Sequence, residues 1–259
     1  MSFDDPDLIA CAELVQRADP DRFRVAMAAP VAARAVLFPI YAANVEVSRA
    51  PWVTQEHLIA EMRLQWWKDA FEEIASTGPV RRHQVVTPLA RVLDAEGAAL
   101  LTGLAEARSW DIYRDPFEDK AHFDRYLRQT SGHLMLAAAR ALGPVDADVV
   151  LELGYAAGLA NYLMAVPALE KAKRVPLLDG RPQAVADLAK DGLVRLQRAR
   201  RQRGKVSVVA RPALLAAWKA GGILARAAAE PQRVAAGALA GSEFADNTGL
   251  MWRAFSGRW

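Results

Sequence analysis

The chain has 259 residues, of which 53% are apolar and 24% charged, a composition typical of globular proteins that excludes a low-complexity chain. The net charge of +3 at pH 7 favours anionic partners only weakly, and an ordinary, slightly basic surface explains it better. The single cysteine, Cys11, excludes an intramolecular disulfide and any metal site that needs two cysteines. This cysteine content suits a reducing cytoplasm.

Alanine is frequent and β-branched residues are sparse, so the chain is expected to fold into helices. The pairs Asp5-Pro6 and Asp19-Pro20 each predict a helix start, with aspartate as the N-cap and proline at the first helical position. A third, apolar helix is expected over residues 30–50, bent at Pro39.

The fourth helix is expected to begin with Thr54 as its N-cap and to end at Gly78-Pro79. Apolar residues recur along it at every fourth position and predict one buried stripe. The members of this stripe are Leu58, Met62, Trp66, Ala70 and Ile74.

Proline and glycine predict the boundaries of the remaining helices. Thr87-Pro88 predicts a helix that breaks at Gly97, and Pro167 predicts the end of a helix that begins at Asp146. The other expected helices cover residues 98–114, 119–142, 184–203, 208–229 and 242–255, with an irregular segment over 171–182.

We find no linker and no internal repeat in the sequence, so residues 1–259 are expected to form one domain. The N-terminus is acidic and has no apolar run, so no signal peptide is expected. The longest uncharged stretch, residues 153–169, is short for a membrane span and contains glycine, asparagine and proline, which favours a buried helix. The sequence therefore predicts a cytoplasmic protein without a transmembrane segment.

The most distinctive string is Arg63-Leu-Gln-Trp-Trp-Lys-Asp-Ala-Phe-Glu-Glu-Ile74. Adjacent residues of a helix point about 100° apart, so Trp67 is expected on a different face from Trp66, together with Arg63 and Phe71. Two interpretations stay open. The helix is buried on two sides, or these side chains form the aromatic and arginine wall of a ligand cavity.

This string resembles the corresponding helix of the squalene/phytoene synthase superfamily, and other strings resemble the same family in the same order. They are Phe38-Pro-Ile-Tyr-Ala-Ala-Asn-Val-Glu46, Tyr126-Leu-Arg-Gln-Thr-Ser-Gly-His133, Gly154-Tyr-Ala-Ala-Gly-Leu-Ala-Asn161 and Leu250-Met-Trp-Arg-Ala-Phe-Ser-Gly257. The chain is most similar to the branch that includes the mitochondrial complex I assembly factor of this fold and its bacterial relatives. The resemblance implies an all-α, isoprenoid-synthase-type helical bundle with a central cavity.

Catalytic members of this family hold Mg²⁺ with two acidic motifs, whose carboxylates lie four residues apart on facing helices. Carried over to this chain, the four acidic positions fall on Ser48, Trp52, Ala165 and Leu169, and only the asparagine of the second motif is kept, as Asn161. The resemblance therefore implies no metal site, no catalytic residue and no cofactor. Mg²⁺ is expected only if the chain is an active transferase.

The same strings supply eight candidates for the cavity or for a ligand site: Tyr41, Asn44, Glu46, Arg63, Trp67, Phe71, His133 and Asn161. Asn44, Glu46 and Asn161 are expected to form a polar trio in an otherwise apolar cavity. Glu46 offers an oxygen ligand for a cation, although pairing with an arginine such as Arg63 is the preferred interpretation. His133 is expected either in the cavity wall or, by preference, in the core.

A basic stretch lies near the end of the helix expected over residues 184–203. It contains Arg195, Arg198, Arg200, Arg201, Arg203 and Lys205. A solvated helix end is the preferred interpretation, and an anionic membrane surface or an acidic partner protein is the alternative. Nucleic acid is disfavoured because no aromatic residues are interleaved for base stacking.

Two hypotheses about function follow from the resemblance. In the first, the chain is a non-catalytic relative, peripheral on the inner membrane, that assists assembly of respiratory complex I or a related membrane enzyme. Its expected partners are a membrane surface, a subunit of the respiratory complex and a prenyl lipid. In the second, the chain is an active prenyl transferase that condenses prenyl diphosphates with Mg²⁺, and the missing acids argue against this hypothesis.

Overall fold

The computed structural model describes residues 5–76 and 78–259, and its regular elements in this part of the chain are helices. The acidic start of the chain, residues 1–4, lies outside it. The α-helices are α1 (Pro6–Ala18), α2 (Pro20–Ala28), α3 (Val31–Arg49), α4 (His57–Ala75), α5 (Val86–Leu89), α6 (Ala95–Arg108), α7 (Lys120–Leu127), α8 (His133–Leu142), α9 (Ala147–Lys171), α10 (Pro182–Arg201), α11 (Arg211–Leu214), α12 (Ala220–Ala229), α13 (Gln232–Ala235) and α14 (Glu243–Ser256). The shorter turns are η1 (Ser109–Asp111), η2 (Arg128–Gly132), η3 (Arg203–Lys205), η4 (Val208–Ala210) and η5 (Leu215–Ala217). The expected all-α fold is confirmed.

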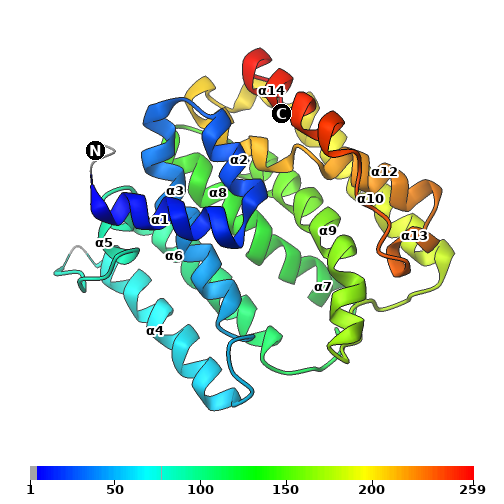
Figure 1. Cartoon of the computed structure of the whole chain (residues 1–259), viewed down its shortest axis with the longest axis horizontal. Coiled ribbons are helices and arrows are strands. Elements are labelled where there is room, and N and C mark those ends of the chain that lie inside the picture. The colour runs from blue at the N-terminus through cyan, green and yellow to red at the C-terminus, as the bar shows by residue number, and fades with distance from the viewer. Residues whose placement is uncertain (1–4, 77) are drawn as a thin grey trace.

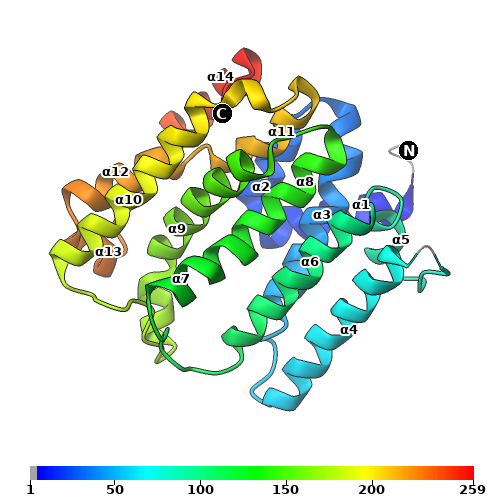
Figure 2. The same cartoon turned by 180° about the vertical axis from the view of Figure 1, so that it is seen from behind.

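The helices form a row across the molecule, in the order α4, α6, α8, α9, α10 and α12, in which each packs against the next (Figure 2). Helices α1, α2 and α3 lie on the other side of this row, where α3 packs against α8 and α1 (Figure 1). Helix α9 is 25 residues long and contacts both α8 and α10. It therefore runs through the middle of the bundle.

Several helix starts follow the sequence directly. Asp5 and Asp19 cap α1 and α2, and each carboxylate accepts a hydrogen bond from a backbone N–H of the first turn, that of Asp7 and that of Arg22. Ser242 is the N-cap of α14, at the position where the last helix was expected to begin. The irregular segment expected over residues 171–182 is confirmed in its main part, between α9 and α10.

The expected helix over residues 119–142 is one continuous rod, but its middle is a π-helical turn, η2. Two glycines of α9 lie against this turn. A Cβ placed on Gly154 would lie 2.7 Å from the Cα of Gly132, and one placed on Gly158 would lie 2.6 Å from the Cβ of Ser131. Only a residue without a side chain allows two helix backbones to approach this closely. The widened turn and the glycines of α9 therefore fit each other.

Four expectations about where helices begin, end or continue were wrong. Helix α9 continues through Pro167 to Lys171. Gly97 does not break a helix, because its N–H is held at 2.7 Å by the carboxylate of Asp94, the N-cap of α6. The N-cap of α4 is Glu56 rather than Thr54, whose hydroxyl instead accepts a hydrogen bond from the Glu56 N–H. The helix expected over residues 208–229 is divided by η4 and η5.

The expected stripe on α4 was wrong in its first three members, Leu58, Met62 and Trp66, whereas Ala70 and Ile74 are buried as expected. Leu58 and Met62 are 67% and 64% exposed, while Trp67 and Phe71 are 5% and 1% exposed. A four-residue repeat drifts by about 40° at each step, so such a stripe leaves the core-facing side of a helix within a few turns. The buried side follows the spacing of three and four residues and consists of Ala60, Leu64, Trp67, Ala70, Phe71 and Ile74.

Three segments are long and apolar enough, by length and composition alone, to cross a membrane. They are Val31–Arg49, Ala147–Lys171 and Val208–Ala229, and 50% to 67% of each apolar window is buried inside the fold. The absence of a transmembrane segment therefore stays a prediction.

The contact between α9 and η2 yields the first testable prediction. Gly154→Ala pushes a methyl group into the η2 backbone and is expected to lower the free energy of unfolding by about 1–3 kcal/mol. Gly249→Ala in α14 is the matched helical control, because no neighbouring atom lies within 4 Å of its new Cβ. That change is expected to raise stability by about 0.5–1 kcal/mol. Equal effects in denaturant unfolding would contradict the close packing of α9 on η2.

Candidate functional site

A cavity of about 240 Å³ lies where α2, α3, α6, η2 and α9 meet. Its wall mixes polar and apolar groups and consists of Asp19, Arg22, Asn44, Ser48, Arg108, Tyr126, Leu127, Thr130, Ser131, Leu134, Gly158, Asn161, Tyr162 and Ala165. The cavity therefore contains more polar groups than the expected trio, although apolar side chains form a large part of its wall. Asn44 and Asn161, from α3 and α9, face the same space.

Two further hollows adjoin this central cavity and share its wall. One, of about 190 Å³, shares Arg108, Tyr126, Tyr162 and Ala165 and adds Trp52, Leu169 and Arg174. The other, of about 230 Å³, shares Asp19, Arg22 and Asn161 and leads towards Lys219. We call the first of these the Arg174 hollow.

Arg22 and Asp19 form an ion pair at the start of α2, and their side chains are only 20% and 21% exposed. Burial acts to raise the pKa of the Asp19 carboxyl, but Arg22 outweighs it and holds that pKa below its ordinary value of 3.8. Burial likewise acts to lower the pKa of Arg22, and Asp19 outweighs it. The guanidinium also lies 5.8 Å from the centre of the Tyr41 ring. Both side chains therefore stay charged inside the fold.

A second group in which buried charges are paired consists of Arg108, Asp111 and Tyr126. The Arg108 guanidinium donates to the Asp111 carboxylate at 2.9 Å and to the Tyr126 hydroxyl at 2.8 Å. The Tyr126 hydroxyl donates in turn to Asp111 at 2.9 Å. Burial raises the pKa of Tyr126, so its hydroxyl keeps its proton. This group closes one end of the cavity with fixed, paired charges.

Arg174, in the loop after α9, lies at the mouth of the Arg174 hollow. Its guanidinium stacks 4.5 Å from the centre of the Trp52 ring and donates to the backbone carbonyls of Tyr113 and Asp111. It makes no ion pair with any carboxylate in residues 5–76 and 78–259. The hollow is lined by two arginines, Arg108 and Arg174, and by two acids, Asp111 and Asp115, and Arg174 is the arginine of this set that no ion pair holds in the described ranges.

The four positions that the family resemblance assigns to metal-binding acids all line these spaces. Ser48 and Ala165 face the central cavity, and Trp52, Ala165 and Leu169 face the Arg174 hollow. The Ser48 hydroxyl is donated to the carbonyl of Val45, and the other three side chains offer no oxygen. Mg²⁺ requires oxygen ligands, mainly carboxylates, so this donor set does not fit the metal. No group of three His, Cys, Asp or Glu side chains in the described residues is arranged to hold a metal ion.

Five of the predicted site residues lie elsewhere in the molecule. Arg63 is exposed on α4, and no ion pair in the described ranges joins it to Glu46. Glu46 lies close enough to His83 for its charge to act on that ring. Trp67 and Phe71 pack in the core, with ring centroids 5.7 Å apart. His133 is a partly buried residue of α8, and its Nδ1 lies 3.1 Å from the carbonyl of Leu100.

Tyr41 lies beside the cavity in a small hollow that it shares with Arg22 and Asn161. Burial raises the pKa of this phenol, and its hydroxyl has no hydrogen-bond partner in the described structure. A buried hydroxyl of this kind is a donor for a ligand or a water molecule.

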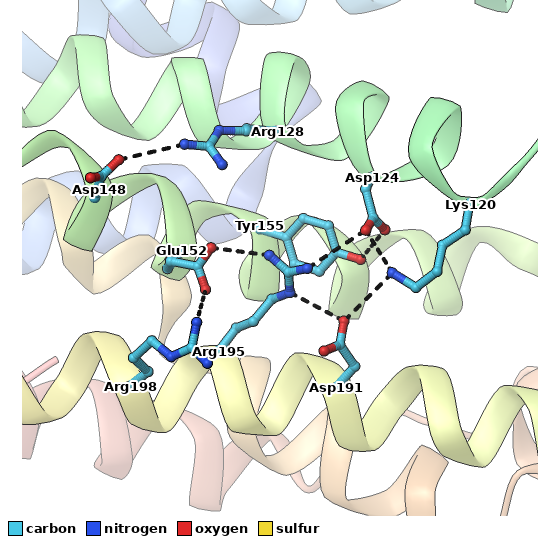
Figure 3. A network of polar contacts seen from close by, with 9 residues as sticks. All are labelled: Lys120, Asp124, Arg128, Asp148, Glu152, Tyr155, Asp191, Arg195 and Arg198. Atoms are coloured by element: carbon cyan, nitrogen blue, oxygen red, sulfur yellow. Dashed lines mark hydrogen bonds and ion pairs between the residues drawn. The ribbon is translucent and has the colours of Figure 1, made fainter.

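The basic stretch divides into paired and unpaired residues. Arg195 bonds Glu152 at 3.0 Å and Asp191 at 3.1 Å and lies 4.2 Å from the centre of the Tyr155 ring, in the network drawn in Figure 3. Arg198 and Lys205 also face carboxylates, those of Glu152 and Asp146. The remaining members, Arg200, Arg201 and Arg203, make no ion pair in the part of the chain that the structure describes.

Sequence reasoning missed Asp19, Arg22, Arg108, Asp111 and Arg174. Asp19 was assigned only to capping, and its second role needs Arg22, which lies one turn further along α2. Arg108 and Asp111 lie three residues apart, a spacing that favours an ion pair but is common on solvated helices. The sequence gives no sign that this pair is buried.

The fold and the cavity define an all-α protein of the isoprenoid-synthase type. The chain belongs to the squalene/phytoene synthase family, whose model matches residues 15–178.

The similar solved structures are enzymes of this family. A dehydrosqualene synthase crystallised with a ligand superposes with a TM-score of 0.74 over 96% of this chain and 95% of its own, at 16% identity. A squalene synthase from Alicyclobacillus acidocaldarius gives a TM-score of 0.69 over 87% of this chain and 94% of its own, also at 16% identity. At this identity the likeness shows the fold alone.

The similar curated proteins are assembly factors of NADH dehydrogenase (ubiquinone) complex I. The assembly factor 6 homologue of Drosophila melanogaster is 28% identical over 178 residues, which are 64% of this chain and 53% of the fly protein. Assembly factor 6 of Homo sapiens is 25% identical over 163 residues, which are 61% of this chain and 48% of the human protein. The chain thus spans about half the length of these relatives.

The Asp19–Arg22 pair yields a prediction about acid stability. Because the folded pKa of Asp19 lies below its ordinary value of 3.8, the pair stabilises the fold fully above about pH 4, and this contribution is lost as the pH falls through the folded pKa. Asp19→Asn keeps the cap but removes the charge, and is expected to cost about 2–3 kcal/mol at pH 7 and to flatten the loss of stability in acid.

Asp187→Asn is the control for this prediction, because Asp187 forms an exposed ion pair with Lys190, with side chains 59% and 57% exposed. Screening by solvent leaves such a pair with little effect on stability. Denaturant unfolding between pH 7 and pH 2 checks the comparison. Parallel pH curves for the wild type and Asp19→Asn would contradict the role of the pair.

Proposed function

We propose that this chain is a non-catalytic member of the squalene/phytoene synthase family that assists assembly of respiratory complex I. The curated relatives from fly, cattle and human support this role, because each is named as an assembly factor of that complex. The proposal extends the assembly role of these relatives to a chain that covers about half of their length.

One observation carries the non-catalytic half of the proposal. The positions that the resemblance assigns to metal-binding acids hold Ser48, Trp52, Ala165 and Leu169, and a guanidinium, that of Arg174, stacks against Trp52. A divalent cation finds no carboxylate at these positions and meets a fixed positive charge beside them. Ionisation of a prenyl diphosphate needs the opposite arrangement.

The cavity is better suited to binding an anionic group than to catalysing a reaction of that group. Arg22 and Arg108 are already paired with Asp19 and Asp111, whereas Arg174 makes no ion pair in the described ranges and lies in a hollow lined by Phe117, Tyr162 and Leu169, with Asp115 as a further acid in its wall. A charged head beside Arg174 with an apolar chain along these side chains is the arrangement that a prenyl lipid or a similar amphiphile would use. We include such a lipid in the proposal.

The assembly role predicts a specific loss in cells. Deleting the gene for this chain is expected to reduce assembled complex I on native gels and NADH–quinone oxidoreductase activity in membranes, while succinate oxidation stays unchanged. Normal complex I in the deletion strain would contradict the proposal.

Rescue of this strain separates the cavity from the rest of the fold. Arg174→Gln removes the free charge of the Arg174 hollow and is expected to restore less complex I than the wild type does. Arg63→Gln is the matched control, because Arg63 is an exposed arginine outside the cavity, and it is expected to restore complex I fully. Thermal unfolding of both purified variants shows whether the fold is kept, and equal rescue by the two would contradict a role for the cavity.

The alternative is an active prenyl transferase, and the structural likeness to two synthases is the reason to test it. An enzymatic assay provides this test. Purified protein with farnesyl or geranylgeranyl diphosphate and Mg²⁺ is expected to give no more product than a protein-free control. Turnover above that control would contradict the non-catalytic assignment.

A further inference from the structure

Helix α14 turns its apolar side away from the protein. Phe244, Met251, Trp252 and Phe255 are 79%, 70%, 64% and 87% exposed, although most large apolar side chains of the fold are buried. Their spacing of seven, eight and eleven residues places them on one face. Leu250, on the opposite side, is 4% exposed and lies in the core, and α14 packs against α2 and η5. In Figure 1 the helix runs along one edge of the molecule.

This arrangement reverses the usual pattern of a surface helix, whose apolar side faces the core. Four large side chains on one exposed face form a contiguous patch of the kind that marks an interaction site. The rings of Trp252 and Phe255 lie with centroids 6.3 Å apart and extend this patch over the last turns of the helix. We call these four residues the α14 face.

Arginines surround the end of α14. Arg200 donates to the backbone carbonyl of Trp259 at 3.0 Å, and a Cβ on Gly257 would lie 3.7 Å from the Arg211 guanidinium. Burial, together with the nearby charges of Arg253 and Arg203, lowers the pKa of Arg200 to about 10. Like charges therefore gather here.

These arginines lack acidic partners. Within residues 5–76 and 78–259, Arg200, Arg203, Arg211, Arg253 and Arg258 make no ion pair. The Nη2 of Arg200 and the Nε of Arg211 are buried without a hydrogen-bond acceptor. Unpaired guanidinium groups beside exposed aromatic rings call for an anionic, amphiphilic counterpart.

We infer that the α14 face binds the surface of an anionic lipid bilayer. The aromatic and methionine side chains enter the boundary between headgroups and acyl chains, and the exposed arginines Arg203 and Arg258 contact lipid phosphates. A second copy of the chain is a poorer candidate for covering the α14 face, because a symmetric dimer contact would bring the same arginines of the two copies against each other. The inference does not rest on the proposed function, because lipid binding is measured without the respiratory complex.

The outer face of α4 provides a matched comparison within the same chain. Leu58 and Met62 are about as exposed as Met251 and Trp252. Glu56 and Glu61 lie beside that face together with one exposed arginine, Arg63, so it lacks the cluster of arginines that surrounds the end of α14. An anionic bilayer should therefore distinguish the two apolar faces.

Co-sedimentation of the full chain with vesicles tests the inference. We expect binding to vesicles of phosphatidylcholine with phosphatidylglycerol and little binding to phosphatidylcholine alone. The double variant Trp252→Ser/Phe255→Ser is expected to lose binding by at least about tenfold, whereas Leu58→Ser/Met62→Ser is expected to bind like the wild type. Arg203→Gln and Arg258→Gln are each expected to weaken binding about fivefold.

Circular dichroism and thermal unfolding show whether each variant keeps its fold. If the double variant Trp252→Ser/Phe255→Ser unfolds, Arg203→Gln still tests the inference. Failure of the wild type to bind anionic vesicles would overturn the inference. So would equal loss of binding in the α4 and α14 variants. The α14 variant could also bind vesicles like the wild type but lose self-association or the binding of a protein partner. That result would assign the α14 face to a protein contact and would likewise overturn the inference.

Discussion

The close approach of α9 to the π-helical turn η2 is the constraint on which the rest of the structure depends. Gly154 and Gly158 bring the backbone of the central helix against Gly132 and Ser131. This contact fixes where Asn161 and Ala165 of α9 lie relative to Thr130 and Ser131 of η2, and all four residues line the cavity. The glycines therefore set the shape of the site although they contribute no chemistry to it.

Charge is handled differently in the different parts of this cavity. Arg22 and Arg108 are held by Asp19 and Asp111, so their charges are fixed in place and largely cancelled. Arg174 is held by carbonyls and an aromatic ring, which orient the guanidinium without neutralising it. Under the proposed function, a site of this kind would hold an anion beside Arg174 without the divalent cations that drive departure of a diphosphate.

The sequence predicts the helices better than the site. Aspartate–proline pairs act locally, so the starts of α1 and α2 follow from a few neighbouring residues. The cavity depends on contacts between residues far apart in the chain, such as Arg174 with Trp52. Trp67, Phe71 and His133 share the motifs that carry the family resemblance, but they pack in or against the core. A motif of buried residues thus indicates a fold without indicating which of its members face a ligand.

Helix α2 contributes to the cavity and also contacts α14. Its first turn contributes Asp19 and Arg22 to the cavity, and the same helix, only nine residues long, packs against α14. Asp19 is both the cap of α2 and the counter-ion of Arg22. An anion that draws Arg22 away from Asp19 would therefore disturb the start of α2 and, through it, the seat of α14. One short helix thus supports both the wall of the cavity and the position of α14.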